Sequence, residues 1–240
     1  MEQFDIYKDI AERTDGCVYL GIVGPVRTGK STFIKRFMDL LVLPNIENNY
    51  ARERAQDELP QSASGKNIMT TEPKFVPNEA VAITVGDDVN LKVRMIDCVG
   101  YIVPEAEGHM EEENIPRMVH TPWSQEPMPF LEAAELGTKK VITDHSTIGI
   151  VITTDGSVTD LSREGYEDAE QRVIYELKQI GKPFIVLLNT ARPYSDDTLS
   201  LQQELSEKYN VPVVPVNCAQ LKSEDIKNIL EKVLYEFPMK

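Results

Sequence analysis

One segment constrains this chain more than any other: a glycine-containing loop between an apolar stretch and an amphipathic one. Residues 24–31 read GPVRTGKS and fit the pattern G-x-x-x-x-G-K-[ST]. The preceding residues 17–23, CVYLGIV, predict a short buried strand. The following residues, from Ser31 to about Leu43, predict a helix with one apolar face that ends at Pro44. A strand, a loop of this type and a helix in this order predict a phosphate-binding P-loop.

The residue types of the loop suit the binding of a nucleoside triphosphate with Mg²⁺. Backbone N–H groups and the N-terminus of the following helix would surround the phosphates, and Gly29 would permit close backbone approach. Lys30 would reach the β- and γ-phosphates, and the Ser31 hydroxyl would bind Mg²⁺. The residues predicted to contact the nucleotide here are Gly24, Pro25, Val26, Arg27, Thr28, Gly29, Lys30, Ser31 and Thr32.

Arg27 has two interpretations. Its guanidinium would lie near the oxygens that bridge the phosphates and would neutralise developing charge, as an arginine finger supplied by the same chain. In the other interpretation, which we favour, it points to solvent or pairs with an acidic neighbour.

A second motif, D-x-x-G, follows a predicted hairpin. VAITV at 81–85 and LKVRMID at 91–97 predict two strands joined by a turn at Gly86-Asp87. The second strand ends at Asp97, and Cys98-Val99-Gly100 completes the motif. Asp97 would hold Mg²⁺, usually through water, and the Gly100 N–H would meet the γ-phosphate.

A further metal ligand is expected from the irregular region before the hairpin. A threonine hydroxyl there would bind Mg²⁺, and Thr70 and Thr71 are the candidates. The alternative is a pair of threonines that only stabilises a turn.

The position that would read the nucleotide base departs from that of GTPases. GTPases of this topology carry N-K-x-D after the next-to-last strand, and the Asp reads the guanine edge. Here the strand PFIVLLN is followed by Thr190-Ala191-Arg192, so Asn189 is kept and the Asp is replaced by Arg. Arginine cannot accept hydrogen bonds from guanine, which removes about 1–3 kcal/mol of discrimination. We therefore expect ATP as the nucleotide, with Asn189, Thr190 and Cys218 in the base-contacting region.

From residue 148 onward, apolar strands alternate with helices. The strands are predicted at IGIVITT, PFIVLLN and VPVVPVN, and the helices at 163–180, 198–209 and 222–236. Wholly apolar strands in such an alternation predict an α/β fold with a mostly parallel sheet, one antiparallel hairpin strand and helices on both faces. The length of 240 residues favours one enlarged P-loop NTPase domain over 1–240, with irregular regions at about 44–79 and 101–147.

Charge and cysteine content indicate which binding partners and which cellular compartment to expect. The 39 acidic and 25 basic residues give a formal charge of −14, which repels phosphate backbones, so nucleic acid is not expected as a partner. The three cysteines are far apart and fit no disulfide framework or zinc spacing. The first sixteen residues are polar and do not resemble a signal peptide, so the cytoplasm is expected.

Three segments carry a family resemblance: GIVGPVRTGKSTFIKRFMDLLVLPNIEN, ERAQDELPQSASGKNIMTTEPKFVPNEAV and MIDCVGY. They resemble the stage IV sporulation protein A family, the coat-basement ATPases of endospore-forming bacteria, and the resemblance covers the whole chain. It implies a GTPase-like fold that hydrolyses ATP rather than GTP. It also implies that Lys30 is the phosphate-binding lysine, Asp97 the Mg²⁺-associated acid, and Thr70-Thr71 the sensor threonines.

The resemblance implies a role beyond hydrolysis. In that family hydrolysis drives polymerisation into the basement layer of the spore coat, on the forespore surface in the mother-cell cytoplasm. A small amphipathic membrane-binding peptide recruits the full-length protein to that membrane, where other coat proteins join it. Family members continue beyond residue 240, so this chain is expected to be the N-terminal nucleotide-binding domain. The alternatives are a GTP-binding regulatory switch, and a structural module that nucleotide stabilises without turnover.

Overall fold

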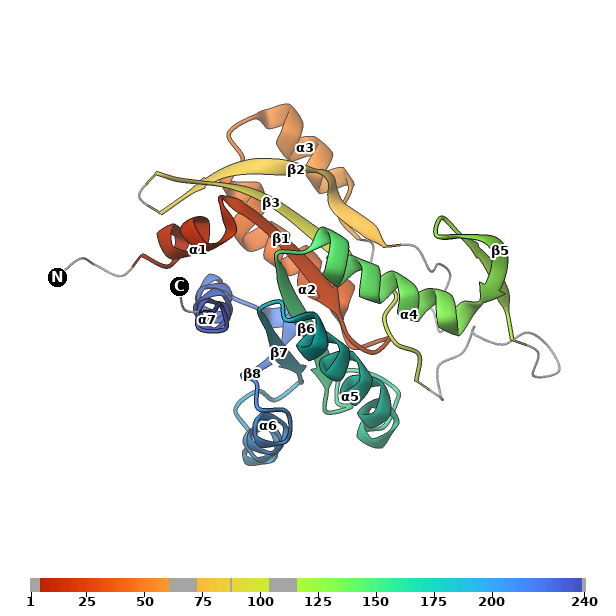
Figure 1. Ribbon diagram of the computed structural model, residues 1–240. Coiled ribbons are helices and arrows are strands. Elements are labelled where there is room, and N and C mark those ends of the chain that lie inside the picture. The colour runs from red at the N-terminus through yellow and green to blue at the C-terminus, as the bar shows by residue number, and fades with distance from the viewer. Residues whose placement is uncertain (1–4, 61–72, 87, 104–115, 239–240) are drawn as a thin grey trace.

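A six-stranded sheet forms the centre of the computed structural model, which describes residues 5–60, 73–86, 88–103 and 116–238 (Figure 1). The strand order is β2-β3-β1-β6-β7-β8, and all neighbours are parallel except β2 and β3. This confirms the predicted mostly parallel α/β sheet with one antiparallel strand. The strands are β1 (Cys17–Val23), β2 (Lys74–Val85), β3 (Val89–Asp97), β6 (Ile148–Thr154), β7 (Phe184–Asn189) and β8 (Val213–Val216).

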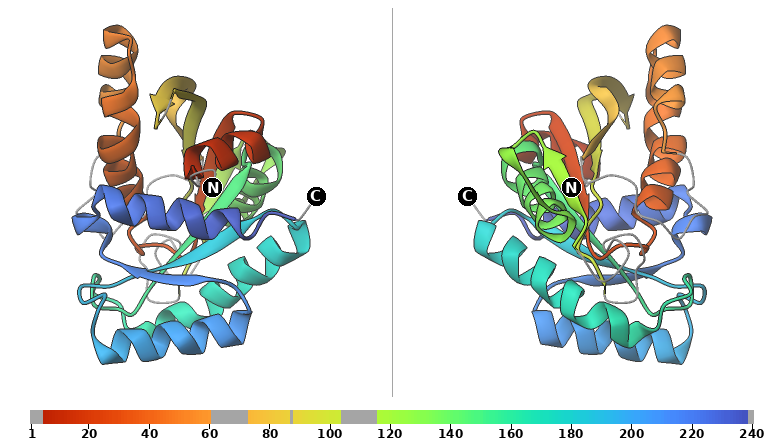
Figure 2. Two further views of the ribbon diagram at one scale, coloured as in Figure 1. Left: turned by 90° about the vertical axis from the view of Figure 1, so that its left-hand side faces the viewer. Right: turned by 90° about the vertical axis from the view of Figure 1, so that its right-hand side faces the viewer.

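Helices cover both faces of the sheet, as predicted. Figures 1 and 2 show α5 and α6 on one side of β7 and β8, and α7 on the other. Alternate residues of each strand point to opposite faces, so Ile150 and Ile152 join one buried cluster while Val151 joins the second. The helices are α1 (Ile6–Thr14), α2 (Lys30–Phe37), α3 (Asn49–Asp57), α4 (Phe130–Lys140), α5 (Arg163–Ile180), α6 (Asp196–Tyr209) and α7 (Ser223–Leu234).

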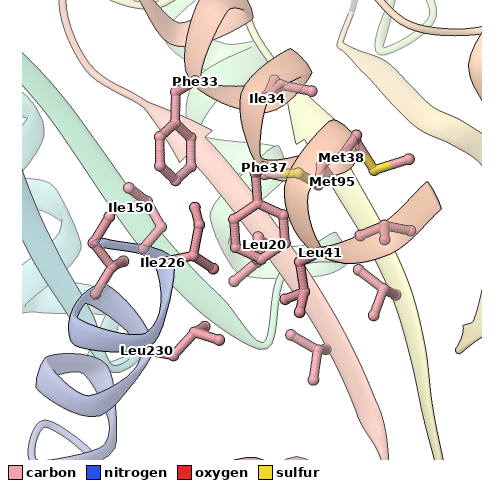
Figure 3. Packing of buried hydrophobic residues seen from close by; sticks show 14 of the residues in the cluster. Leu20, Phe33, Ile34, Phe37, Met38, Leu41, Met95, Ile150, Ile226 and Leu230 are labelled. Atoms are coloured by element: carbon pink, nitrogen blue, oxygen red, sulfur yellow. The ribbon is translucent and has the colours of Figure 1, made fainter. Parts of the chain in front are cut away.

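The helix after the glycine loop is anchored deep in the core. Its buried residues Phe33, Phe37 and Met38 face the β1 residue Leu20 and the α7 residue Ile226 (Figure 3). α2 continues as a π-helical turn at Met38–Val42 and a 3₁₀ turn at Leu43–Asn45. The helical segment therefore runs close to its predicted end, and its burial fixes the loop that precedes it.

The two regions expected to be irregular contain regular elements. Within 44–79, α3 forms because the Asn48 side chain caps it, accepting from the Ala51 N–H at 3.0 Å, and because ARERAQ is rich in helix formers. β2 begins at Lys74 rather than at Val81, with a register shift against β3 between Val76 and Val81. Periodicity missed this early start because the shift interrupts the alternation.

The second region, 101–147, contains a hairpin and a helix within its described residues 116–147. β4 (Met118–Thr121) and β5 (Ser124–Pro129) pair as a separate two-stranded sheet. A two-stranded sheet has only edge strands, so it accommodates Pro127 and Pro129 of β5. α4 extends past Gly137 to Lys140 and a further turn reaches His145.

The N-terminal segment also contains an element that its charged composition concealed. Asp5 caps α1 by accepting from the N–H groups of Tyr7 and Lys8, and the helix buries Ile10 against the sheet. In the described part of the chain, no helix has the length and hydrophobicity needed to span a bilayer.

Candidate nucleotide-binding site

The glycine loop connects the carboxyl end of β1 to the N-terminus of α2. Gly29 precedes the helix with φ 98°, and Gly24 has φ 135°, conformations that favour glycine. A Cβ on Gly24 would lie 2.2 Å from the carbonyl oxygen of Ile152, so no larger residue fits there. The Thr28 hydroxyl closes the loop by donating to the Pro25 carbonyl at 3.0 Å. The predicted strand–loop–helix arrangement is therefore present.

Lys30 lies inside the loop. Its side chain is buried, and its Nζ donates to the carbonyl oxygen of Pro25 at 2.6 Å. Burial lowers the pKa of Lys30, while the electrostatic interactions with Cys98 and Asp97 act in the opposite direction. A cation held by neutral carbonyls at this point is suited to phosphate oxygens, which would compensate its charge.

Ser31 and Asp97 meet beside the lysine. The Ser31 hydroxyl donates to an Asp97 carboxylate oxygen at 2.7 Å, although 66 residues separate the two in sequence. Burial raises the pKa of Asp97, opposed by the hydrogen bond from Ser31 and by the charge of Lys30. The pair offers two hard oxygen ligands, which suits Mg²⁺ because this ion takes few protein ligands together with phosphate and water.

Two other predicted metal ligands, Thr70 and Thr71, lie outside the described residues. Their role stays a prediction. Among the described residues, no group of three or more His, Cys, Asp and Glu side chains is placed to hold a metal ion.

The D-x-x-G segment lies directly on the glycine loop. Gly100 has φ 87°, and a Cβ added to it would lie 2.0 Å from the Gly24 carbonyl oxygen and 2.9 Å from the Lys30 Nζ. The next residue, Tyr101, donates its N–H to Gly24 at 3.2 Å and accepts from the Val26 N–H at 2.9 Å. Gly100 is thus placed beside the lysine amine, and the predicted contact of its N–H with a terminal phosphate stays a prediction.

Asn189 connects the glycine loop to the segment after β8. Its Nδ2 donates to the Thr28 carbonyl at 2.9 Å, and its Oδ1 accepts from the Cys218 N–H at 3.0 Å. The Cys218 side chain is buried in the hydrophobic core, which raises the pKa of its thiol to about 12, and its backbone N–H makes the contact with Asn189. A Cβ on Gly29 would lie 2.4 Å from Asn189 Nδ2, so the Asn189 amide can pack this closely on the loop only because residue 29 is glycine.

Asp155 and Ser157, which the sequence did not single out, hold the segment predicted to contact the base. The Thr190 hydroxyl donates to the Asp155 carboxylate at 2.6 Å, and the Ala191 N–H donates to the Ser157 hydroxyl at 2.8 Å. Burial alone would raise the pKa of Asp155, but hydrogen bonds from Ser157 and Thr190 outweigh it and lower the pKa. The available signal was the polar DGS directly after β6, at the same sheet edge as the glycine loop.

Arg27 and Thr32 complete the predicted loop residues. Arg27 has a left-handed backbone with φ 62° and a partly exposed side chain, and no hydrogen bond or ion pair joins that side chain to another described residue. Thr32 lies in the first turn of α2, partly buried. The predicted roles of both residues stay predictions.

A comparison with models of protein families shows which family the chain belongs to. Residues 1–238 match the family described as "Stage IV sporulation protein A, ATPase domain". The chain belongs to the stage IV sporulation protein A family. The matched region is an ATPase domain, so ATP hydrolysis is the activity of the domain family to which this chain belongs.

Curated relatives agree with this membership. Stage IV sporulation protein A of Bacillus subtilis (strain 168) and that of Bacillus anthracis are each 59% identical to the chain over 239 residues, which is 100% of the chain and 48% of each relative. The protein of the same name from Clostridioides difficile (strain 630) is 60% identical over 235 residues, or 98% of the chain and 48% of that relative. The chain therefore spans about half the length of these stage IV sporulation A relatives.

Proposed function

We propose that this domain hydrolyses ATP in a Mg²⁺-dependent reaction, with Ser31 and Asp97 holding the metal. The observation that carries the proposal is the 2.7 Å contact between the Ser31 hydroxyl and the partly buried Asp97 carboxylate, next to the buried Lys30. A carboxylate removed from water at this place is costly unless a cation compensates it. Bound Mg²⁺ would supply that compensation and would neutralise charge on the phosphates.

The residues of the chain act on the phosphates by position and charge. Lys30 would exchange its carbonyl partner at Pro25 for β- and γ-phosphate oxygens. The N–H groups of the glycine loop and of Gly100 would hold the terminal phosphate so that a water molecule attacks it in line. Stabilisation of charge, rather than removal of a proton by a strong base, accounts for this reaction class.

The preference for ATP follows from the segment after β7. Arg192 stands where GTPases place the guanine-reading Asp, and its exposed side chain carries only hydrogen-bond donors. Guanine presents donors at N1 and N2, so an arginine there offers guanine no acceptor. The Thr190 hydroxyl donates to Asp155, so it does not take the place of the carboxylate that GTPases carry at the position of Arg192.

Beyond hydrolysis, we propose a role in sporulation. The relatives bear the name of a sporulation protein, and the proposal is that hydrolysis drives self-assembly of the longer protein into the spore coat basement layer. It would act in the mother-cell cytoplasm, peripheral to the outer forespore membrane, with a small amphipathic membrane-binding peptide and other coat proteins as partners. The net charge of −14 supports the absence of nucleic acid from this set.

The test measures phosphate release from ATP and GTP in parallel, with and without Mg²⁺. The variants are Lys30→Ala and the control Lys35→Ala, which removes an exposed lysine from the same helix. The proposal predicts Mg²⁺-dependent release from ATP that Lys30→Ala abolishes and Lys35→Ala preserves. Release mainly from GTP would identify a GTP-binding switch. Binding and thermal stabilisation without release would identify a module that nucleotide only stabilises.

A further inference from the structure

We propose that Tyr101, held by Glu176 of α5, is a positioning residue that fixes Gly100 at the γ-phosphate end of the site. This inference rests on ATP hydrolysis at the proposed site. It concerns an aromatic residue that is not part of the D-x-x-G motif, and a glutamate 75 positions later in the sequence.

The backbone of Tyr101 joins the D-x-x-G segment to the glycine loop. The Tyr101 N–H donates to the Gly24 carbonyl at 3.2 Å, and the Val26 N–H donates to the Tyr101 carbonyl at 2.9 Å. Pro25 and Tyr101 thereby form a parallel bridge that continues the pairing of β1 and β3 beyond the ends of both strands. Because Gly100 directly precedes Tyr101, this bridge fixes the backbone immediately after the Gly100 N–H and limits how far that N–H can move.

The side chain of Tyr101 is held by residues of α5, which fixes its end of the Pro25–Tyr101 bridge. Tyr101 is 1% exposed, and its hydroxyl donates to the carboxylate of Glu176. The guanidinium carbon of Arg172, one turn earlier on α5, lies 5.3 Å from the centre of the Tyr101 ring. Arg172 is itself held by Glu135 of α4 at 2.7 Å. Two helices on one face of the sheet therefore fix the orientation of this tyrosine.

Burial and the neighbouring carboxylate determine what the hydroxyl can do. Burial raises the pKa of Tyr101, and the hydrogen bond to Glu176 raises it further, so the phenol stays neutral and acts as a donor. Removing the hydroxyl leaves the Glu176 carboxylate without this donor and removes one of the contacts that fix the ring. We expect the first effect at the backbone of the preceding residue, Gly100, where an added Cβ would lie 2.0 Å from the Gly24 carbonyl oxygen and 2.9 Å from the Lys30 Nζ.

The proposal predicts a specific effect on nucleotide binding. Gly100 would meet the γ-phosphate, which ATP carries and ADP lacks. If Tyr101 serves this contact, losing its hydroxyl weakens binding of ATP and slows turnover but leaves binding of ADP intact. A tyrosine that merely fills the core would lower the melting temperature without this distinction, since packing in the core is shared by both nucleotide complexes.

The chain provides a matched control on the same helix. The Tyr209 hydroxyl donates at 2.7 Å to Glu170 of α5, so Tyr209→Phe also removes a hydroxyl from an α5 carboxylate. We would compare Tyr101→Phe and Tyr209→Phe for melting temperature, kcat, KM, and the Kd values of ADP and a non-hydrolysable ATP analogue. A second pair, Glu176→Gln and Glu176→Ala, keeps or removes the acceptor of the Tyr101 hydroxyl.

The expected result is a kcat roughly five- to tenfold lower for Tyr101→Phe, the scale of one lost hydrogen bond, with weaker binding of the ATP analogue and unchanged binding of ADP. Glu176→Ala should reproduce this result, whereas Glu176→Gln should keep most of the wild-type kcat. Tyr209→Phe should change only the melting temperature. Equal losses for ADP and the ATP analogue, or an unchanged kcat in Tyr101→Phe, would overturn the inference. Absence of turnover in the wild type would instead overturn the proposed function, and the ratio of the two Kd values would still test Tyr101.

Discussion

The Ser31 hydroxyl and the Asp97 carboxylate lie 2.7 Å apart because β1 and β3 are parallel neighbours that end at the same edge of the sheet. Burial there raises the pKa of Asp97 above 3.8, although the Ser31 hydroxyl and the Lys30 charge favour its ionised form. The ionised Asp97 carboxylate therefore lowers the stability of the fold when no Mg²⁺ is bound. If Asp97 serves metal binding rather than stability, its replacement should leave or raise the stability of the nucleotide-free protein but lower the turnover of ATP.

Asp97→Asn should leave the nucleotide-free protein as stable as the wild type or more stable, and should abolish Mg²⁺-dependent turnover. The amide keeps an acceptor for Ser31 but removes the buried charge. Because the folded pKa is raised, the wild type loses stability relative to the variant as pH rises from 3.8 through the folded pKa. Thermal melts of both proteins at several pH values, with and without Mg²⁺-ATP, would measure this. A variant that melts well below the wild type without nucleotide at neutral pH would contradict the prediction.

Gly100→Ala should abolish turnover and destabilise the fold, because the new methyl would lie 2.0 Å from the Gly24 carbonyl oxygen. Gly181→Ala is the matched control. Gly181 also has a positive φ, 73°, but a Cβ there meets nothing within 4 Å, so its cost is backbone strain alone, about 1–2 kcal/mol. Urea unfolding and phosphate release would separate the two effects. Equal activity in the two variants would show that the contact between Gly100 and the glycine loop is not required.

The sequence predicted the parts of the site that short motifs specify. Asp97 and Asn189 end β3 and β7, and Lys30 begins the helix after the loop that follows β1, so the parallel strands bring all three to one edge of the sheet. Their roles in binding stay predictions. The ranges of the later strands and of α5 were also predictable, since strong periodicity and flanking turns define them.

The remaining parts depend on pairings that no local pattern contains. Asp155 and Thr190 are 35 residues apart, and Tyr101 and Glu176 are 75 apart, so neither pair forms a motif. The hairpin β4–β5 was hidden by its prolines, and α1 by its charge. Each of these elements is stabilised by a cap or by tertiary contacts that outweigh the local sequence preference.

Arg192→Asp should raise the affinity for GTP relative to ATP by roughly tenfold, because it returns a guanine acceptor to the fourth position of the N-K-x-D pattern that begins at Asn189. Arg192 is exposed, so the substitution should not disturb the fold. Arg192→Ala is the control, because it removes the positive charge without supplying an acceptor. Competition binding with the two nucleotides would measure the ratio. A similar ratio in both variants would place the base away from residue 192.

Arg163→Ala should destabilise the domain by about 3–5 kcal/mol, because it leaves the fully buried Glu170 carboxylate without its cation. The guanidinium donates to both Glu170 oxygens at 2.6 and 2.8 Å, and the Tyr209 and Thr153 hydroxyls donate to the same carboxylate. Arg54→Ala breaks a comparable contact, a 3.1 Å pair with Glu79, but both of its side chains are at least half exposed, so a loss of about 0–1 kcal/mol is expected. Denaturant unfolding of the two variants measures the difference. Similar small losses would mean that the hydroxyl donors alone are enough to hold the Glu170 charge, and that α5 does not depend on the ion pair for its attachment to β6.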